Sequence, residues 1–253
     1  MSPAPTRIAR FLGSTLAALP AACLRRPGAT LRQFERVAFG TLPIVAAAGV
    51  SVGVVTWLQA RAALARFGLV ETLPSLLSAS LFIETGPMLA SLLIAGRMGS
   101  GLAAELAAMR LTEELDAREV LGAPVVANLV APRVLACALA APLLTELVDA
   151  AALLGAFLAE LAAGGIAPAL FARRVLDVAR LSDIIPATLK TSLFGGLVGL
   201  VGCGTGYFAK PDAESIGHAA TQGVVRAMLA VFLADAALVP IVQAASNLLL
   251  RFD

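Results

Sequence analysis

The stretch that decides the fold, residues 84–122, reads ETGPMLASLLIAGRMGSGLAAELAAMRLTEELDAREVLG. Its first half is an apolar run that contains one carboxylate, Glu84. Its second half, residues 105–119, holds five acidic and two basic residues in fifteen positions. A helix with so many charges cannot lie in lipid, so we expect it in water at a membrane face. A short polar helix tied to two membrane spans is suited to transmit force from a soluble partner to a membrane domain.

The composition predicts a membrane protein rather than a soluble domain. Of the 253 residues, 59% are hydrophobic and 14% are charged, whereas about a quarter are charged in soluble proteins. No polar block is long enough to fold separately, so we expect one membrane domain, residues 39–253, after an N-terminal segment, residues 1–38. A net charge of +2 without a basic stripe argues against nucleic acid. One histidine and the widely spaced Cys23, Cys137 and Cys203 argue against disulfides and a metal site.

Five apolar runs are long enough to cross a bilayer as helices, which takes roughly 20 residues. Runs without alternation exclude a barrel and indicate an all-α integral membrane protein. Before them, residues 1–38 combine six arginines with spaced apolar side chains, which predicts an interfacial amphipathic helix or, alternatively, a disordered basic tail. We expect Pro20 and Pro27 to divide this segment and residues 31–39 to form a second short helix. The predicted spans are 39–58, 73–96, 134–158, 184–208 and 224–250.

The arginines and lysines between the spans predict the orientation of the chain. With the N-terminus in the cytoplasm, the inside segments carry eleven of them and the outside segments carry six. This bias predicts a cytoplasmic N-terminus, a periplasmic C-terminus and a cytoplasmic charged helix between the second and third spans. Outside, residues 171–180 are expected to form a surface helix. The inside segments are 1–38, 95–133 and 209–223.

The charged stretch resembles the signature of the MlaE (YrbE) family, the permease subunits of bacterial ABC systems that move phospholipids and other lipids between membranes. The family pattern is close to A-G-R-x-G-S-G-x-A-A-E-L-x-x-M-R-x-T-E-Q-x-D-A-x-E-x-M-G. The resemblance covers nearly the whole chain, from about Gln33 to Leu238. Together with Glu114, the matching residues expected to couple the chain to an ATPase are Arg97, Gly99, Gly101, Glu105, Arg110, Glu113, Asp116 and Glu119.

The resemblance also implies partners. It implies a permease in the bacterial inner membrane that dimerises with a second copy, carries a cytoplasmic ABC ATPase subunit and meets a periplasmic MCE-domain protein. It also allows for a STAS-domain accessory protein. ATP and Mg are then bound by the ATPase, because a P-loop needs a glycine directly before its lysine and both lysines here follow other residues. We therefore expect no cofactor and no enzymatic activity in this chain.

Each charged side chain inside a predicted span raises the free energy of membrane insertion by about 2.5–3.5 kcal/mol, so we expect each to have a role. Glu84 and Lys190 lie about 16 Å and 9 Å into spans that enter from the same face. They either line a cavity for a zwitterionic or anionic lipid headgroup or form a buried ion pair that fixes helix packing. The resemblance favours the cavity, because the two residues stand in the family's R-E-L-G-P and L-I-K-S motifs.

Other intramembrane acids leave a different function open. Glu146 and Asp149 share a helix face and are expected to form interhelical hydrogen bonds, as Asp235 is expected to make a packing contact. With Glu84, the first two define the alternative function, a proton-coupled secondary transporter. Inverted repeats would support that alternative, and the two halves of the sequence show none.

Two shorter patterns predict contacts. In residues 195–206, GGLVGLVGCGTG, small residues four apart predict close approach between helices. Residues 214–221 resemble the family's E-G-I-x-x-A-T-T and are expected to form either a second contact with the ATPase or a solvated loop.

Overall fold

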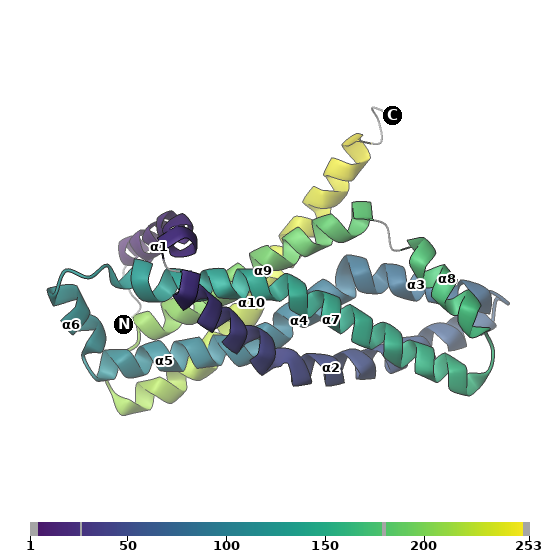
Figure 1. The fold of residues 1–253 in the computed structure, drawn as a ribbon, viewed down its shortest axis with the longest axis horizontal. Helices are drawn as coiled ribbons and strands as arrows, with labels where there is room; N and C mark the ends of the chain where they lie inside the picture. Colours follow the sequence, from purple (N-terminus) through teal and green to yellow (C-terminus); the bar gives the residue numbers. More distant parts are fainter. Residues whose placement is uncertain (1–4, 26, 179–180, 250–253) are drawn as a thin grey trace. The chain divides into compact units, whose positions relative to one another are not determined.

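The structure, a computed structural model, describes residues 5–25, 27–178 and 181–249, and every regular element in these ranges is a helix (Figure 1). Five helical segments are long and apolar enough to cross a membrane. This confirms the all-α class, the number of spans and an additional N-terminal helix. The segments are Pro27–Ala65, Val70–Leu111, Val126–Ala163, Pro186–Tyr207 and Ala213–Pro240.

The spans are built from long α-helices and short π-helical turns. The first, fourth and fifth spans belong to α2 (Pro27–Ala65), α9 (Leu181–Tyr207) and α10 (Ala213–Leu249). The third span joins η4 (Val126–Val130) to α7 (Ala131–Ala163). The second span runs through η1 (Val70–Thr72), α3 (Leu73–Ser80), η2 (Leu81–Thr85), α4 (Gly86–Ile94), η3 (Ala95–Gly99) and α5 (Ser100–Leu111). Three shorter helices are α1 (Pro5–Arg25), α6 (Glu114–Val120) and α8 (Pro168–Val178).

Contacts divide the described chain into two compact units. The first unit comprises Met1–Val37, Ile94–Ala140 and Ser192–Asp253. The second unit comprises Ala38–Leu93 and Ala141–Thr191. The charged segment around α6 therefore lies in the first unit, and both Glu84 and Lys190 lie in the second.

In the first unit, glycines bring the backbones of η3, α5, α9 and α10 into contact. A Cβ atom at Gly223 would collide with the carbonyl oxygen of Gly99, and one at Gly206 would collide with that of Ala103. Gly202 likewise faces Gly99. Helices that lack side chains at the crossing can approach closely enough for extensive van der Waals contact. The close approach predicted from residues 195–206 is thereby confirmed.

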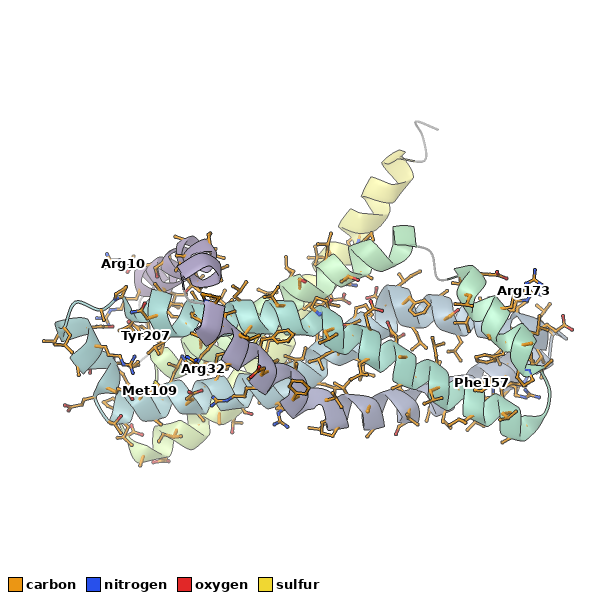
Figure 2. All side chains as sticks on the ribbon, in the orientation of Figure 1. Arg10, Arg32, Met109, Phe157, Arg173 and Tyr207 are labelled. Atoms are coloured by element: carbon orange, nitrogen blue, oxygen red, sulfur yellow. The ribbon has the colours of Figure 1, made fainter. Side chains whose placement is uncertain are left out.

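In the second unit, an apolar core forms around the end of α2. Trp57, Leu73 and Leu77 are buried together with Phe171 of α8. The Phe171 ring meets Phe157 of α7 edge-on, with ring centroids 5.4 Å apart; Phe157 is labelled in Figure 2. This contact explains why a short amphipathic segment is ordered as a helix. The helix predicted within residues 171–180 is confirmed up to Val178, whereas Ala179 and Arg180 lie outside the described residues.

The N-terminal segment divides at Pro27 as predicted, because α1 ends at Arg25 and α2 begins at Pro27, but it does not divide at Pro20. Pro20 lies inside α1, where a proline removes one backbone hydrogen bond and crowds the carbonyl one turn earlier, at a cost of about 3 kcal/mol. Ala18 and Ala22 on either side of it are buried against Ala131, which holds the helix through that position. Pro27 begins α2, and proline is favoured at the first position of a helix. No separate helix therefore covers residues 31–39.

The predicted single charged helix, residues 105–119, is two helices in the structure. α5 ends at Leu111, and α6 begins at Glu114. Between them Glu113 has φ 57°, a left-handed conformation that a right-handed helix cannot contain. Leu115 at the start of α6 is fully buried, and this anchor fixes the new direction of the chain.

Candidate functional site: a charged helix and an intramembrane ion pair

The charged helix α6 is fixed to its own unit by ion pairs and hydrogen bonds. Arg110 Nη1 lies 2.8 Å from Asp116 Oδ1, and Arg118 pairs with Glu114 one turn away. These groups are partly exposed, so each pair contributes only about 0–1 kcal/mol to stability. The Arg110–Asp116 pair nevertheless joins α6 to the end of α5, whereas the Arg118–Glu114 pair lies within α6 itself.

Apolar side chains at the end of α6 are almost completely exposed. Val120 is 88% exposed and Leu121 is 83% exposed, next to the acidic side chain of Glu119. A hollow of about 400 Å³ beside them is lined by Glu119, Gly122, Pro124 and other residues. Adjacent apolar side chains that are exposed and surrounded by polar residues form a surface to which a partner can bind. We call α6 with Glu113, Val120 and Leu121 the α6 tip.

A cluster of three aromatic rings connects the α6 tip to α1 and α9. Tyr207, at the end of α9 (Figure 2), donates a hydrogen bond from its hydroxyl to Glu119 Oε1 at 2.7 Å. Its ring centroid lies 5.3 Å from that of Phe11 and 5.1 Å from that of Phe208. The sequence prediction missed this cluster, although the only tyrosine of the chain stands at the end of a predicted span.

The other residues predicted to contact an ATPase lie apart from the α6 tip. Glu105 accepts a hydrogen bond from the buried Arg133 at 2.8 Å and also pairs with Arg36. Gly99 is buried where α10 crosses. Arg97 and Gly101 are exposed, each on a different turn of the second span. The structure therefore places Glu105 and Gly99 in contacts between helices, whereas Glu113, Asp116 and Glu119 are exposed.

The structure brings Glu84 and Lys190 together in the second unit. Lys190 Nζ lies 3.0 Å from both carboxylate oxygens of Glu84. Glu84 stands in the π-helical turn η2, and Lys190 stands in α9. The lysine side chain is 9% exposed and the glutamate side chain 41% exposed. The ion pair is therefore buried on its cationic side and open on its anionic side.

Two further intramembrane acids, Glu146 and Asp149, do not form the predicted hydrogen bonds with described residues. Asp149 is 3% exposed and faces the backbone of Gly86, which offers no side-chain donor, so its Oδ1 has no partner among the described residues. Glu146 on the same helix is exposed, and no described side chain bonds to it. The structure thus corrects the expected hydrogen bonds of Glu146 and Asp149. Asp235 is buried in α10 of the first unit.

A buried carboxylate that the sequence prediction missed lies at the end of α7. Glu160 is 1% exposed and accepts hydrogen bonds from Trp57 Nε1 at 2.7 Å and from Ile166 N at 2.9 Å. The Arg61 guanidinium pairs with the same carboxylate and lies over the Trp57 ring, 5.4 Å from its centroid. This network joins α2 to α7 and to the loop after α7.

Residues 214–221, predicted as a contact or a loop, are helical. They form the first turns of α10, and Asp212 Oδ1 accepts the Ser215 N–H at its start. A hollow of about 660 Å³ lies beside them, lined among others by Lys210, His218 and Arg226. Cys137 and Cys203 are free buried thiols as expected, and the side chain of Cys23 lies outside the described residues.

Five apolar spans, ion pairs within them and an exposed charged helix between the second and third define a multi-pass helical membrane protein. The chain belongs to the MlaE permease family, because the family model described as Permease MlaE matches residues 30–241. This places it among the permeases of ABC transporters, a class that works with an ATPase.

Relatives support the same assignment. A probable ABC transporter permease protein of Synechocystis sp. is 33% identical over 206 residues, which cover 81% of this chain and 78% of that protein. A probable ABC transporter permease protein of Rickettsia typhi is 29% identical over 205 residues, covering 81% and 79%. The chloroplastic protein trigalactosyldiacylglycerol 1 of Arabidopsis thaliana is 31% identical over 206 residues, covering 81% of this chain and 59% of that protein.

Proposed function

We propose that this chain moves phospholipid or a related lipid between the bacterial inner membrane and a periplasmic MCE-domain carrier, driven by an ATPase that docks on the α6 tip. Membership of the MlaE permease family supports the ABC mechanism. The name of the Arabidopsis relative, which is that of a glycolipid, supports a lipid as cargo. In this arrangement the chain works as a homodimer, and a STAS-domain protein is a further partner on the ATPase side.

The observation that carries the proposal is the α6 tip. Its acidic residues and the exposed Val120 and Leu121 offer a partner both charge and apolar area. The buried Leu115 and the Arg110–Asp116 ion pair attach the tip to the rest of its unit. A displacement of the tip by a bound partner would therefore also move α5, which is the end of the second span. The excess of arginine in the segments on this side favours a cytoplasmic position, where ATP is available.

The ion pair of Glu84 and Lys190 is suited to contact the lipid that is transported. A carboxylate and an ammonium 3.0 Å apart present both signs of charge to a headgroup. The open side of Glu84 leaves it accessible from outside the unit, as a substrate contact requires. ATP and Mg are bound by the ATPase in this scheme, and this chain supplies no catalytic residue.

Reversing the charges of Glu113 and Asp116 together to lysine is expected to release the ATPase or to uncouple its activity from lipid transport. The membrane domain should stay folded, because the Arg110–Asp116 ion pair is partly exposed and contributes only about 0–1 kcal/mol. The measurement is co-purification of the ATPase with the tagged chain, together with lipid transfer to an MCE-domain acceptor. Reversal of the exposed Glu71 and Asp177, both in the second unit, is the matched control.

Three results would count against the proposal. Normal ATPase binding and transport by the double variant would show that the α6 tip is only a solvated surface. ATP turnover by the chain alone would contradict a separate ATPase. Lipid movement that follows a proton gradient without ATP would favour the secondary transporter.

A further inference from the structure

The hollow of about 660 Å³ beside the start of α10 is a groove between two segments of the first unit. One wall comes from Thr205, near the end of α9, and from Phe208, which follows that helix. The other wall is the face of α10 that carries His218, Gln222 and Arg226. These three residues are four positions apart, so they form one row along the helix.

The row on α10 consists of hydrogen-bond donors. Arg226 carries a permanent positive charge and a fork of N–H groups, Gln222 carries an amide NH₂, and His218 carries a ring N–H. His218 and Arg226 are exposed, and Gln222 is half-buried. None of the three side chains forms a hydrogen bond or an ion pair with another described residue. Their donors are therefore free to bind a ligand in the groove.

The carboxylates among the described lining residues lie at one end of the groove. Asp212 and Glu214 stand there together with Lys210, where the chain enters α10. Asp212 is already engaged, because its Oδ1 accepts a backbone N–H at the start of the helix. From His218 to Arg226 the sequence HAATQGVVR contains no acidic residue. This section of the groove therefore has an excess of positive charge and of donors.

The excess of donors identifies the chemistry of the ligand as anionic. A guanidinium fork matches two oxygens of a phosphate group and forms charge-assisted hydrogen bonds with them. Basic pockets between membrane-spanning helices bind the phosphates of lipid headgroups in the same way. Val225 and Leu229, beside Arg226 and one turn from it, are 47% and 55% exposed. They would contact acyl chains if the phosphate belongs to a lipid.

We propose that His218, Gln222 and Arg226 bind a phosphate group, supplied by the headgroup of an anionic lipid or by a phosphate ion in solution. Arg226 is the main contact, because it brings the permanent charge and two parallel donors. The site is separate from Glu84 and Lys190, which belong to the second unit, and it does not depend on the proposed transport function.

The lipid test compares two lipids with the same acyl chains and different headgroup charge. The full chain, purified in detergent, is incubated with equal amounts of dioleoyl phosphatidic acid and dioleoyl phosphatidylcholine, and bound lipids are counted by native mass spectrometry. The unaltered chain is expected to retain phosphatidic acid about tenfold over phosphatidylcholine, and Arg226→Gln should reduce this preference to about onefold, the loss expected for one charge-assisted contact. Arg226→Lys, which keeps the charge, should keep most of it. Arg173→Gln is the matched control, because Arg173 is exposed in the second unit.

The second source is tested by titration calorimetry of the same chains with inorganic phosphate in the absence of lipid. Binding of inorganic phosphate that Arg226→Gln abolishes and Arg173→Gln keeps would identify a site for soluble phosphate. A preference for phosphatidic acid without binding of inorganic phosphate would identify a site for a lipid headgroup.

Other results overturn the inference, and lipid transport would stand in each case. Equal retention of the two lipids with no binding of inorganic phosphate would show that the groove holds no anion. A preference that Arg226→Gln leaves unchanged, or that Arg173→Gln reduces equally, would reflect general attraction to a basic protein. Loss of the co-purified ATPase in Arg226→Gln, with lipid and phosphate binding unchanged, would assign the groove to a protein contact.

Discussion

Replacing Glu160 with leucine is expected to lower the free energy of unfolding by about 3–5 kcal/mol, because it removes one partner of a buried charged network. The side chain is 1% exposed, so the groups bonded to it have no water to replace it. Trp57 Nε1 and the Ile166 N–H would each become a buried donor without an acceptor. Arg61 is less affected, since about a quarter of its side chain is exposed.

The measurement is thermal unfolding of the detergent-purified chain. Glu71→Leu is the matched control, because Glu71 lies in the same unit but is exposed, and surface changes usually stay within about 0.5 kcal/mol. An unchanged melting temperature for Glu160→Leu would show that the network forms no part of the folded core.

The class of fold could be predicted because membrane spans leave a strong mark in a sequence. Long apolar runs of about 20 residues admit few structures other than helices. The ends of the spans were less accurate, and most helices are longer than predicted. α7, for example, extends to Ala163, beyond the predicted end of its span at residue 158. A helix can continue through polar residues where other parts of the chain pack against them. Hydropathy is a property of the local sequence and contains no information about such packing.

Tertiary contacts explain the local errors. Nothing in the sequence around Glu113 signals a break, since the residue that takes the left-handed conformation is a glutamate and not a glycine. The break becomes favourable only because Leu115 is buried further along the chain. The same holds for Pro20, whose neighbours are fixed by Ala131 more than a hundred residues away.

The candidate site could be predicted in part. Lone charges in apolar runs identified Glu84 and Lys190, which are 106 residues apart and meet in the structure. The sequence did not predict the network of Trp57, Arg61 and Glu160. Each of these residues lies near the end of a span, where polar side chains can reach water and do not indicate a special role. A possible signal was the occurrence of an acid and an arginine on segments assigned to the same side of the membrane.

The exposure of Glu84 and Lys190 differs, and this difference predicts unequal effects of single substitutions. Glu84→Gln removes the counter-ion from a lysine that is 9% exposed, so a loss of about 3–5 kcal/mol is expected. Lys190→Met leaves a carboxylate that is 41% exposed, and a loss of under about 1 kcal/mol is expected. Both variants should impair lipid transport, because in the proposed function each removes one charge that contacts the headgroup.

The double variant Glu84→Gln, Lys190→Met separates a substrate contact from a packing contact. It should regain most of the stability lost by Glu84→Gln, because no charge is then left in the buried position. Its transport should remain impaired, since restored packing does not restore a headgroup contact. The measurements are melting temperature in detergent and lipid transfer for the two single variants and the double variant. Equal destabilisation by both single changes, with stability and transport both restored in the double variant, would identify a purely structural pair. A stable Lys190→Met chain that assembles with its ATPase but transfers lipid poorly would place the ammonium at the substrate.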